Sequence, residues 1–172
     1  DTVSYAAIYA PVTADLGVDT LESVEALIGT EYDDTLRGDS GPNRLDGGRG
    51  RQLDTLVGGD GNDNYVVDHP REVVIETNAD RATGGIDTVY VDVNYVLGPN
   101  IENARLLTQA PIRLSGNDLD NVVYVGPSPS RIDGGGGADM VSYVFATSPV
   151  TVDLSITGPQ LAGAWGQDTL SW

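Results

Sequence analysis

The sequence predicts an all-β fold in which very short strands stack as a solenoid. Apolar residues recur at a nine-residue spacing in two ladders, with one longer step where residues 51–53 are inserted. The first ladder is Leu27, Leu36, Leu45, Leu56, Tyr65 and Val74, and the second is Leu114, Val123, Ile132, Val141 and Val150. The 22 Gly and 9 Pro residues favour turns over long helices. Because a single short coil cannot cover its own apolar face, stability must come from stacking.

The turns between ladder positions combine glycine with oxygen-bearing side chains. The clearest is 58–66 (GGDGNDNYV), and 134–142 (GGGGADMVS) repeats it. Residues 47–57 repeat it around the insertion 51–53, and 29–37 and 38–46 are weaker copies. Glycines leave main-chain carbonyls uncovered, and Asp and Asn add further oxygens. Such turns suit a hard cation such as Ca²⁺, which takes about 6–8 oxygen ligands.

With this spacing the chain resembles the haemolysin-type, or RTX, calcium-binding nonapeptide repeat GGxGxDxUx. The resemblance implies a right-handed parallel β-roll (a β-solenoid) with calcium-binding glycine-rich turns and an irregular central spacer, and Ca²⁺ as the cofactor. It also implies that calcium lies between every second turn, because these turns stack on the same side of the roll. The ion would be held by the side chain at the sixth place of the nonapeptide and by carbonyls of the turn. The expected pairs are turn 29–34 with 47–54, 38–43 with 58–63, and 116–121 with 134–139.

Carried over residue by residue, the resemblance implies a set of metal-site residues. They are Gly29, Glu31, Asp34, Gly38, Ser40, Asn43, Gly47, Arg49, Asp54, Gly58, Asp60, Gly61, Asp63, Gly116, Asp118, Asn121, Gly134, Gly136 and Asp139. Asn43 and Asn121 stand where the repeat has Asp, and their neutral amides bring less charge, so we expect weaker sites there. We expect the insertion 51–53 to disturb its own turn.

Residues 1–172 are expected to form one β-roll segment, as a fragment of a longer chain. We divide it into a first repeat ladder (27–76), spacer coils (77–111), a second repeat ladder (112–154) and a partial coil (155–172). Residues 1–16 (DTVSYAAIYAPVTADL) align with 139–154 (DMVSYVFATSPVTVDL), which indicates a modular solenoid independently of the nonapeptides. Within the middle section we expect strands at 73–76, 88–93 and 101–107, the last with a short helical turn as the alternative.

The acidic composition excludes several classes of partner. The formal net charge is −17, so we expect neither nucleic-acid binding nor membrane insertion. No cysteine is present, which excludes disulfides, thiolate metal sites and cysteine nucleophiles. A salt-adapted acidic surface is the alternative explanation of the charge, but the excess of Asp over Glu favours turns that hold calcium. The exposed edge coils are expected to pair with neighbouring repeat copies or other cell-surface components.

No catalytic residue is expected, and we predict that this segment is not an enzyme. His69 is the single histidine, and no nucleophile motif accompanies it. Carboxylate pairs of the kind that glycosidases use are present, but their position in the repeat turns favours metal binding. Trp165 and Trp172 are expected to pack against a further coil, with stacking on a sugar as the alternative.

The leading functional prediction is a calcium-binding structural segment of a large secreted bacterial protein, of the adhesin, surface-layer or filament type. An acidic, glycine-rich chain would stay loose in calcium-poor cytosol and fold on external calcium. The resemblance implies type I secretion and an extracellular or cell-surface location. One alternative is a C-terminal accessory module of a secreted protease, lipase, epimerase or peroxidase. The other is a glycan-binding module.

Overall fold

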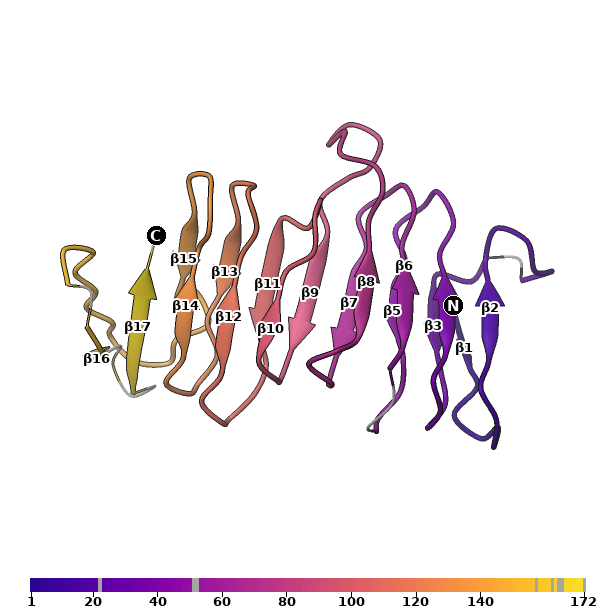
Figure 1. Cartoon of the computed structure of the whole chain (residues 1–172), viewed down its shortest axis with the longest axis horizontal. Coiled ribbons are helices and arrows are strands. Elements are labelled where there is room, and N and C mark those ends of the chain that lie inside the picture. Colours follow the sequence, from indigo (N-terminus) through magenta and orange to yellow (C-terminus); the bar gives the residue numbers. More distant parts are fainter. Residues whose placement is uncertain (22, 51–52, 157, 162, 164–165, 172) are drawn as a thin grey trace.

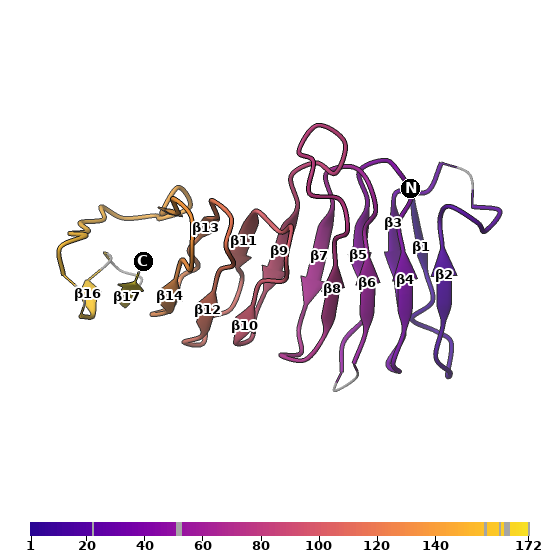
Figure 2. The ribbon, with the colours of Figure 1, turned by 45° about the horizontal axis from the view of Figure 1, so that its top comes forward.

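The computed structural model describes residues 1–172 except 22, 51–52, 157, 162, 164–165 and 172. The chain forms a parallel β-roll in which successive strands, up to β16, alternate between one long sheet and the two shorter sheets that face it (Figure 1). The N-terminal strands lie at one end of the roll and the C-terminal strands at the other. Figure 2 shows the same two layers after a turn of 45°.

The long sheet has the order β1-β3-β5-β7-β9-β11-β13-β15. Its strands are β1 (Thr2–Ser4), β3 (Ala26–Ile28), β5 (Arg44–Asp46), β7 (Asn64–Val67), β9 (Thr88–Val91), β11 (Asn103–Leu106), β13 (Val122–Tyr124) and β15 (Met140–Ser142). All of its neighbouring strands pair in parallel. The predicted strand in 101–107 is therefore confirmed as β11.

The two shorter sheets follow one another along the opposite layer. The first contains β2 (Thr13–Asp15), β4 (Thr35–Arg37), β6 (Thr55–Val57) and β8 (Val73–Ile75), in the order β2-β4-β6-β8. The second contains β10 (Tyr95–Val96), β12 (Arg113–Ser115), β14 (Arg131–Asp133), β17 (Gln167–Ser171) and β16 (Gln160–Leu161), in the order β10-β12-β14-β17-β16. Their strands also pair in parallel, apart from the antiparallel pair of β16 and β17.

The core contains most positions of the predicted apolar ladders, stacked coil on coil, together with residues of the middle coils such as Val89 and Ala104. Leu27, Leu45 and Tyr65 are in register in the long sheet, and Leu36 and Leu56 are in register opposite them. All five side chains are fully buried. Each middle side chain of a three-residue strand points inward, as the alternation of side chains in a strand requires. One nine-residue repeat therefore forms half a coil, and two successive repeats form a full coil.

The predicted second ladder agrees with the structure as far as Val141 but is wrong at its last position, Val150. Leu114, Val123 and Ile132 are buried at 0–1% exposure, but Val150 lies in no strand. The next partner of Ile132 is instead Leu170 of β17. Residues 143–156 contain no strand, so the chain leaves the roll there and the constant spacing no longer predicts the ladder.

The turns form two rows along the roll (Figure 1). The lower turn row joins the long sheet to the shorter sheets and includes 29–34, 47–54, 68–72 and 125–130. The upper turn row joins the shorter sheets back to the long sheet and includes 38–43, 58–63, 76–87, 97–102, 116–121 and 134–139. Within the described residues, no helix has the length and hydrophobicity that a membrane span requires.

Candidate metal centre

The last residue of each repeat turn, here called the sixth-place residue, points into the roll where the turn meets the next strand. Asp63 precedes buried Tyr65 by two positions, and alternate side chains of an extended chain point the same way. The sixth-place residues are Asp34 and Asp54 in the lower turn row and Asn43, Asp63, Asn121 and Asp139 in the upper. All are at most 3% exposed except Asp139, which is half-buried because β15 ends the long sheet.

The structure places the three expected turn pairs next to each other. The amide of Asp34 donates a hydrogen bond of 2.8 Å to Oδ1 of Asp54. In the upper turn row the amide of Asn43 donates in the same way to Oδ1 of Asp63, also at 2.8 Å. The amide of Asn121 donates to Oδ1 of Asp139 at 2.9 Å. One oxygen of each later carboxylate is thus fixed by the preceding coil, and the other oxygen of Asp63 has no hydrogen-bond partner.

The first glycine of each turn lies against a group of oxygens. A Cβ at Gly29 would lie under 3.0 Å from Oδ2 of Asp34 and from the carbonyl oxygen of Gly47. A side-chain oxygen and a main-chain carbonyl oxygen also lie close to Gly38 and to Gly116. The side-chain oxygens there are the amide oxygens of Asn43 and Asn121. Carboxylate, amide and main-chain carbonyl oxygens therefore converge where the chain has no side chain. This donor set, with neither sulfur nor imidazole, fits calcium.

Comparison with known families gives the same assignment. The model of the RTX calcium-binding nonapeptide repeat matches residues 28–65 and 115–143, in four copies. The chain carries RTX calcium-binding repeats. It is therefore a calcium-binding repeat segment, with the parallel β-roll as its fold. No curated protein and no solved structure matched the chain.

The third-place residues of the RTX turns expose their side chains. Glu31, Ser40, Arg49, Asp60 and Asp118 are all exposed, whereas the sixth-place side chains point inward. An Arg guanidinium cannot bind a cation, so Arg49 is suited to contribute only its main-chain carbonyl. Gly59 and Gly61 have φ values of 107° and 111°, which the tight turn 58–63 requires and which glycine adopts without strain.

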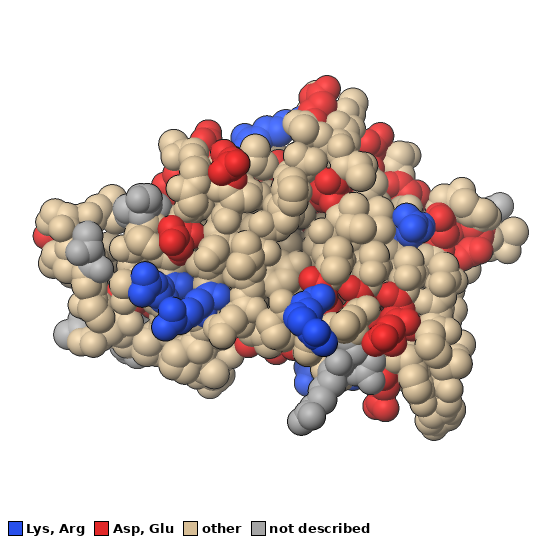
Figure 3. All heavy atoms as spheres, viewed as in Figure 1, with Lys and Arg blue, Asp and Glu red and all other residues tan. Residues whose placement is uncertain are grey.

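Two sixth-place carboxylates lie in an environment that disfavours their charge. Burial raises the pKa of Asp54 to about 6, although the hydrogen bond from the Asp34 amide opposes the rise. Burial likewise raises the pKa of Asp63 to about 6, with the Asn43 amide opposing and the negative charges of Asp39 and Asp60 adding to the rise. Figure 3 shows acidic side chains in several clusters on one face, separated by uncharged surface, and basic ones in a few places. A bound cation would relieve this repulsion.

The sequence did not predict the acidic residues of the middle coils as metal-site residues. The amide of Asp63 donates to Oδ1 of Asp87 at 2.8 Å, and the amide of Asp87 donates to Oε2 of Glu102 at 2.9 Å. The row of oxygens that begins at Asn43 thus continues without a break to Glu102. Asp87 precedes buried Val89 by two positions, as Asp63 precedes Tyr65, and that short pattern could have identified it.

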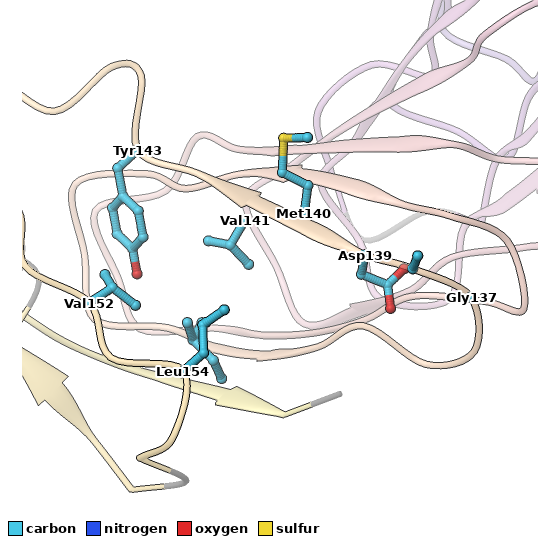
Figure 4. A pocket seen from close by; sticks show the side chains of 9 residues that line it. Gly137, Asp139, Met140, Val141, Tyr143, Val152 and Leu154 are labelled. Atoms are coloured by element: carbon cyan, nitrogen blue, oxygen red, sulfur yellow. The ribbon is translucent and has the colours of Figure 1, made fainter.

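A pocket of about 580 Å³ lies at the C-terminal end of the long sheet, beside the last residues of the turn 134–139. Figure 4 shows that apolar side chains such as Val141, Val152 and Leu154 line it, with Tyr143 and Asp139 at its sides. Among its described lining residues there is no nucleophile paired with a base. His69 is half-buried in the turn 68–72, and Trp165 and Trp172 lie outside the described residues.

Proposed function

We propose that the chain is a structural segment of a large secreted bacterial protein, of the adhesin, surface-layer or filament type, and that it folds on calcium outside the cell. The observation that supports this most is the convergence of sixth-place oxygens and glycine carbonyls at Gly29, Gly38 and Gly116. Such a repeated set of oxygens serves to hold one coil on the next. A structural role is the natural use of a metal that lies between coils.

We assign the calcium sites to the three turn pairs predicted from the repeat. Asp34 and Asp54 would hold calcium in the lower turn row, with the carbonyls of turns 29–34 and 47–54. Asn43 with Asp63, and Asn121 with Asp139, would do so in the upper turn row. The third-place residues would contribute main-chain carbonyls, because their side chains are exposed. The two ladders, 27–76 and 112–154, would then each contain calcium, with spacer coils between them.

Calcium would act on folding through charge and through linkage. Sixth-place carboxylates stack at about the 4.8 Å strand spacing, where like charges repel. A cation that binds only the stacked arrangement adds its binding free energy to the free energy of folding. With a net charge of −17, the chain in calcium-poor cytosol would remain loose enough for export. On this proposal, type I secretion delivers it unfolded, and external calcium folds it.

The test is a calcium titration of the metal-free chain, followed by far-UV circular dichroism and calorimetry. We expect a gain of β structure with calcium and none with magnesium, which prefers a tighter octahedral site. A variant with Asp34→Asn and Asp54→Asn should need more calcium for the same gain. A chain that is equally folded in chelator and in calcium would refute the proposed folding on export.

A further inference from the structure

We propose that Glu76 is a side-chain ligand of a calcium ion held with Asp63 and Asp87, between the turns 58–63 and 76–87. This site rests on the proposed role of the turns as calcium sites. It lies outside the three turn pairs assigned above, although it shares Asp63 with one of them. It also differs in kind, because Glu76 stands where the repeat has its first glycine.

The three carboxylates form one compact group inside the roll. Their exposed fractions are 1% for Asp63, 6% for Glu76 and 1% for Asp87. One carboxylate oxygen from each lies within 4.8 Å of the others. Three buried acids at this separation carry a large desolvation cost and repel one another when ionised. The arrangement is therefore stable as anions only with a cation among them.

Two oxygens of this group have no hydrogen-bond partner. They are Oδ2 of Asp63 and Oε2 of Glu76, both buried. Asp168, an equally buried carboxylate outside the RTX turns, is satisfied by the protein itself. It accepts from the amide of Ser130 and from the hydroxyl of Tyr143. Buried polar atoms without partners are rare in folded proteins, so the two free oxygens indicate a ligand at this place.

The fold directs the Glu76 side chain into the group. Val57 and Ile75 are in register, so Glu76 follows β8 as Gly58 follows β6. A Cβ at Gly58 would lie under 3.0 Å from Oδ2 of Asp63 and Oε1 of Glu76, which shows that the Glu76 carboxylate lies back over this glycine. The hydroxyl of Tyr65 donates to Oε1 of Glu76 and orients it. Asn100 donates to the main-chain carbonyl of Glu76 at 3.0 Å, which leaves the carboxylate as the group for a metal.

The surrounding charges favour a divalent cation over an arginine partner. The charged groups that act on Asp63 and Glu76 are themselves acidic, namely Asp39, Asp60 and Glu102. Among the described residues, no Arg forms an ion pair with the three carboxylates. Hard carboxylate oxygens without sulfur or imidazole select calcium over zinc or copper. Glu76 thus supplies by its side chain an oxygen at a position where the other turns have glycine.

The test counts the calcium ions that the full chain retains. Glu76→Gln keeps the size of the side chain and an acceptor for Tyr65, and Glu76→Gly restores the residue of the repeat. Each should bind one calcium ion fewer than the unaltered chain. Asp168→Asn is the matched control, because Asp168 is an equally buried carboxylate with donors on both oxygens. This control should bind the same number as the unaltered chain.

The outcomes separate this site from the proposed function. An unaltered chain that binds no calcium refutes both proposals. Calcium binding that Asp54→Asn reduces but the Glu76 variants leave unchanged overturns this site alone. If neither Glu76 variant folds, a crystal structure of the unaltered chain grown with calcium decides. Electron density for an ion bonded to Oε2 of Glu76 at about 2.3–2.6 Å is expected, and its absence overturns the proposal.

Discussion

The hydroxyl of Tyr143 donates a hydrogen bond of 2.9 Å to Oδ2 of Asp168 in β17. The amide of Ser130 donates to the other oxygen, Oδ1, at 2.8 Å. Asp168 occupies the same position before a buried strand residue as the sixth-place Asp of the repeats, since Leu170 follows it by two positions. Here the protein itself satisfies the carboxylate, whereas Oδ2 of Asp63 has no donor. The roll thus joins its coils at such corners in two ways, by side-chain donors and by oxygens available to calcium.

Removal of the Tyr143 hydroxyl should destabilise the roll independently of calcium. Tyr143→Phe leaves Oδ2 of buried Asp168 without a donor, and such a loss costs about 1–3 kcal/mol. Urea unfolding should show a similar loss in chelator and in calcium. Tyr9→Phe is the control, because Tyr9 is 89% exposed, and it should change little. A loss that disappears in calcium would contradict this explanation.

A side chain at Gly58 should disturb the oxygens of the upper turn row. The Cβ of Gly58→Ala would lie under 3.0 Å from Asp63, Tyr65 and Glu76 atoms, and overpacking of this kind costs about 1–3 kcal/mol. Calcium titration should also show a weaker affinity. Gly158→Ala is matched to it, because nothing lies within 4 Å of a Cβ there. The control should stay within about 0.5 kcal/mol of the unaltered chain, and equal effects of the two changes would refute the argument.

A carboxylate in place of the Asn43 amide should lower the stability of the metal-free chain and raise its affinity for calcium. The Nδ2 of Asn43 donates to Oδ1 of Asp39 at 3.2 Å. Asn43→Asp replaces this hydrogen bond with repulsion between two carboxylates, so the metal-free chain should lose stability. Calcium affinity should rise by about tenfold, because ligand charge strengthens calcium sites. Calorimetry in chelator and in calcium measures both effects. A fall in calcium affinity would show that Asn43 does not face the ion.

The metal-free chain should be more stable in mild acid than in mild alkali. Burial is the main cause that raises the pKa of Asp54 and Asp63 to about 6, of Asp87 to about 7 and of Glu76 to about 8. The folded chain then binds protons more tightly than the unfolded chain, whose acids titrate near 4. Stability contributed by these groups is full below about pH 4 and is lost as the pH rises through 6 to 8.

Circular dichroism in chelator at pH 5 and pH 8 measures this dependence. We expect more β structure and a higher unfolding midpoint at pH 5. Saturating calcium should reverse the order, because protons compete with the ion for the same oxygens. Unchanged stability between the two pH values in chelator would mean that these carboxylates do not titrate in the folded chain.

The regular coils of this protein could be predicted from the spacing of residues along the chain. The nine-residue spacing of Leu27, Leu36 and Leu45 predicted half a coil per repeat, and the sixth-place residues fell at the predicted corners. This worked because each repeat packs mainly against its neighbours, so local spacing and spatial arrangement follow the same period. The three turn pairs could be predicted for the same reason.

Folding was needed to see that Glu76, Asp87 and Glu102 lie along one turn row, and that Asp168 lies beside Ser130 and Tyr143. Consecutive partners along the upper turn row are 20 residues apart at Asn43 and Asp63, 24 at Asp63 and Asp87, and 15 at Asp87 and Glu102. Ser130 and Asp168 are 38 residues apart. Strand register depends on the three-residue strands that pair, whereas the turns between them vary in length. A fixed period therefore predicts a contact only where the turns keep the length of the repeat, and the irregular coils had to be seen folded.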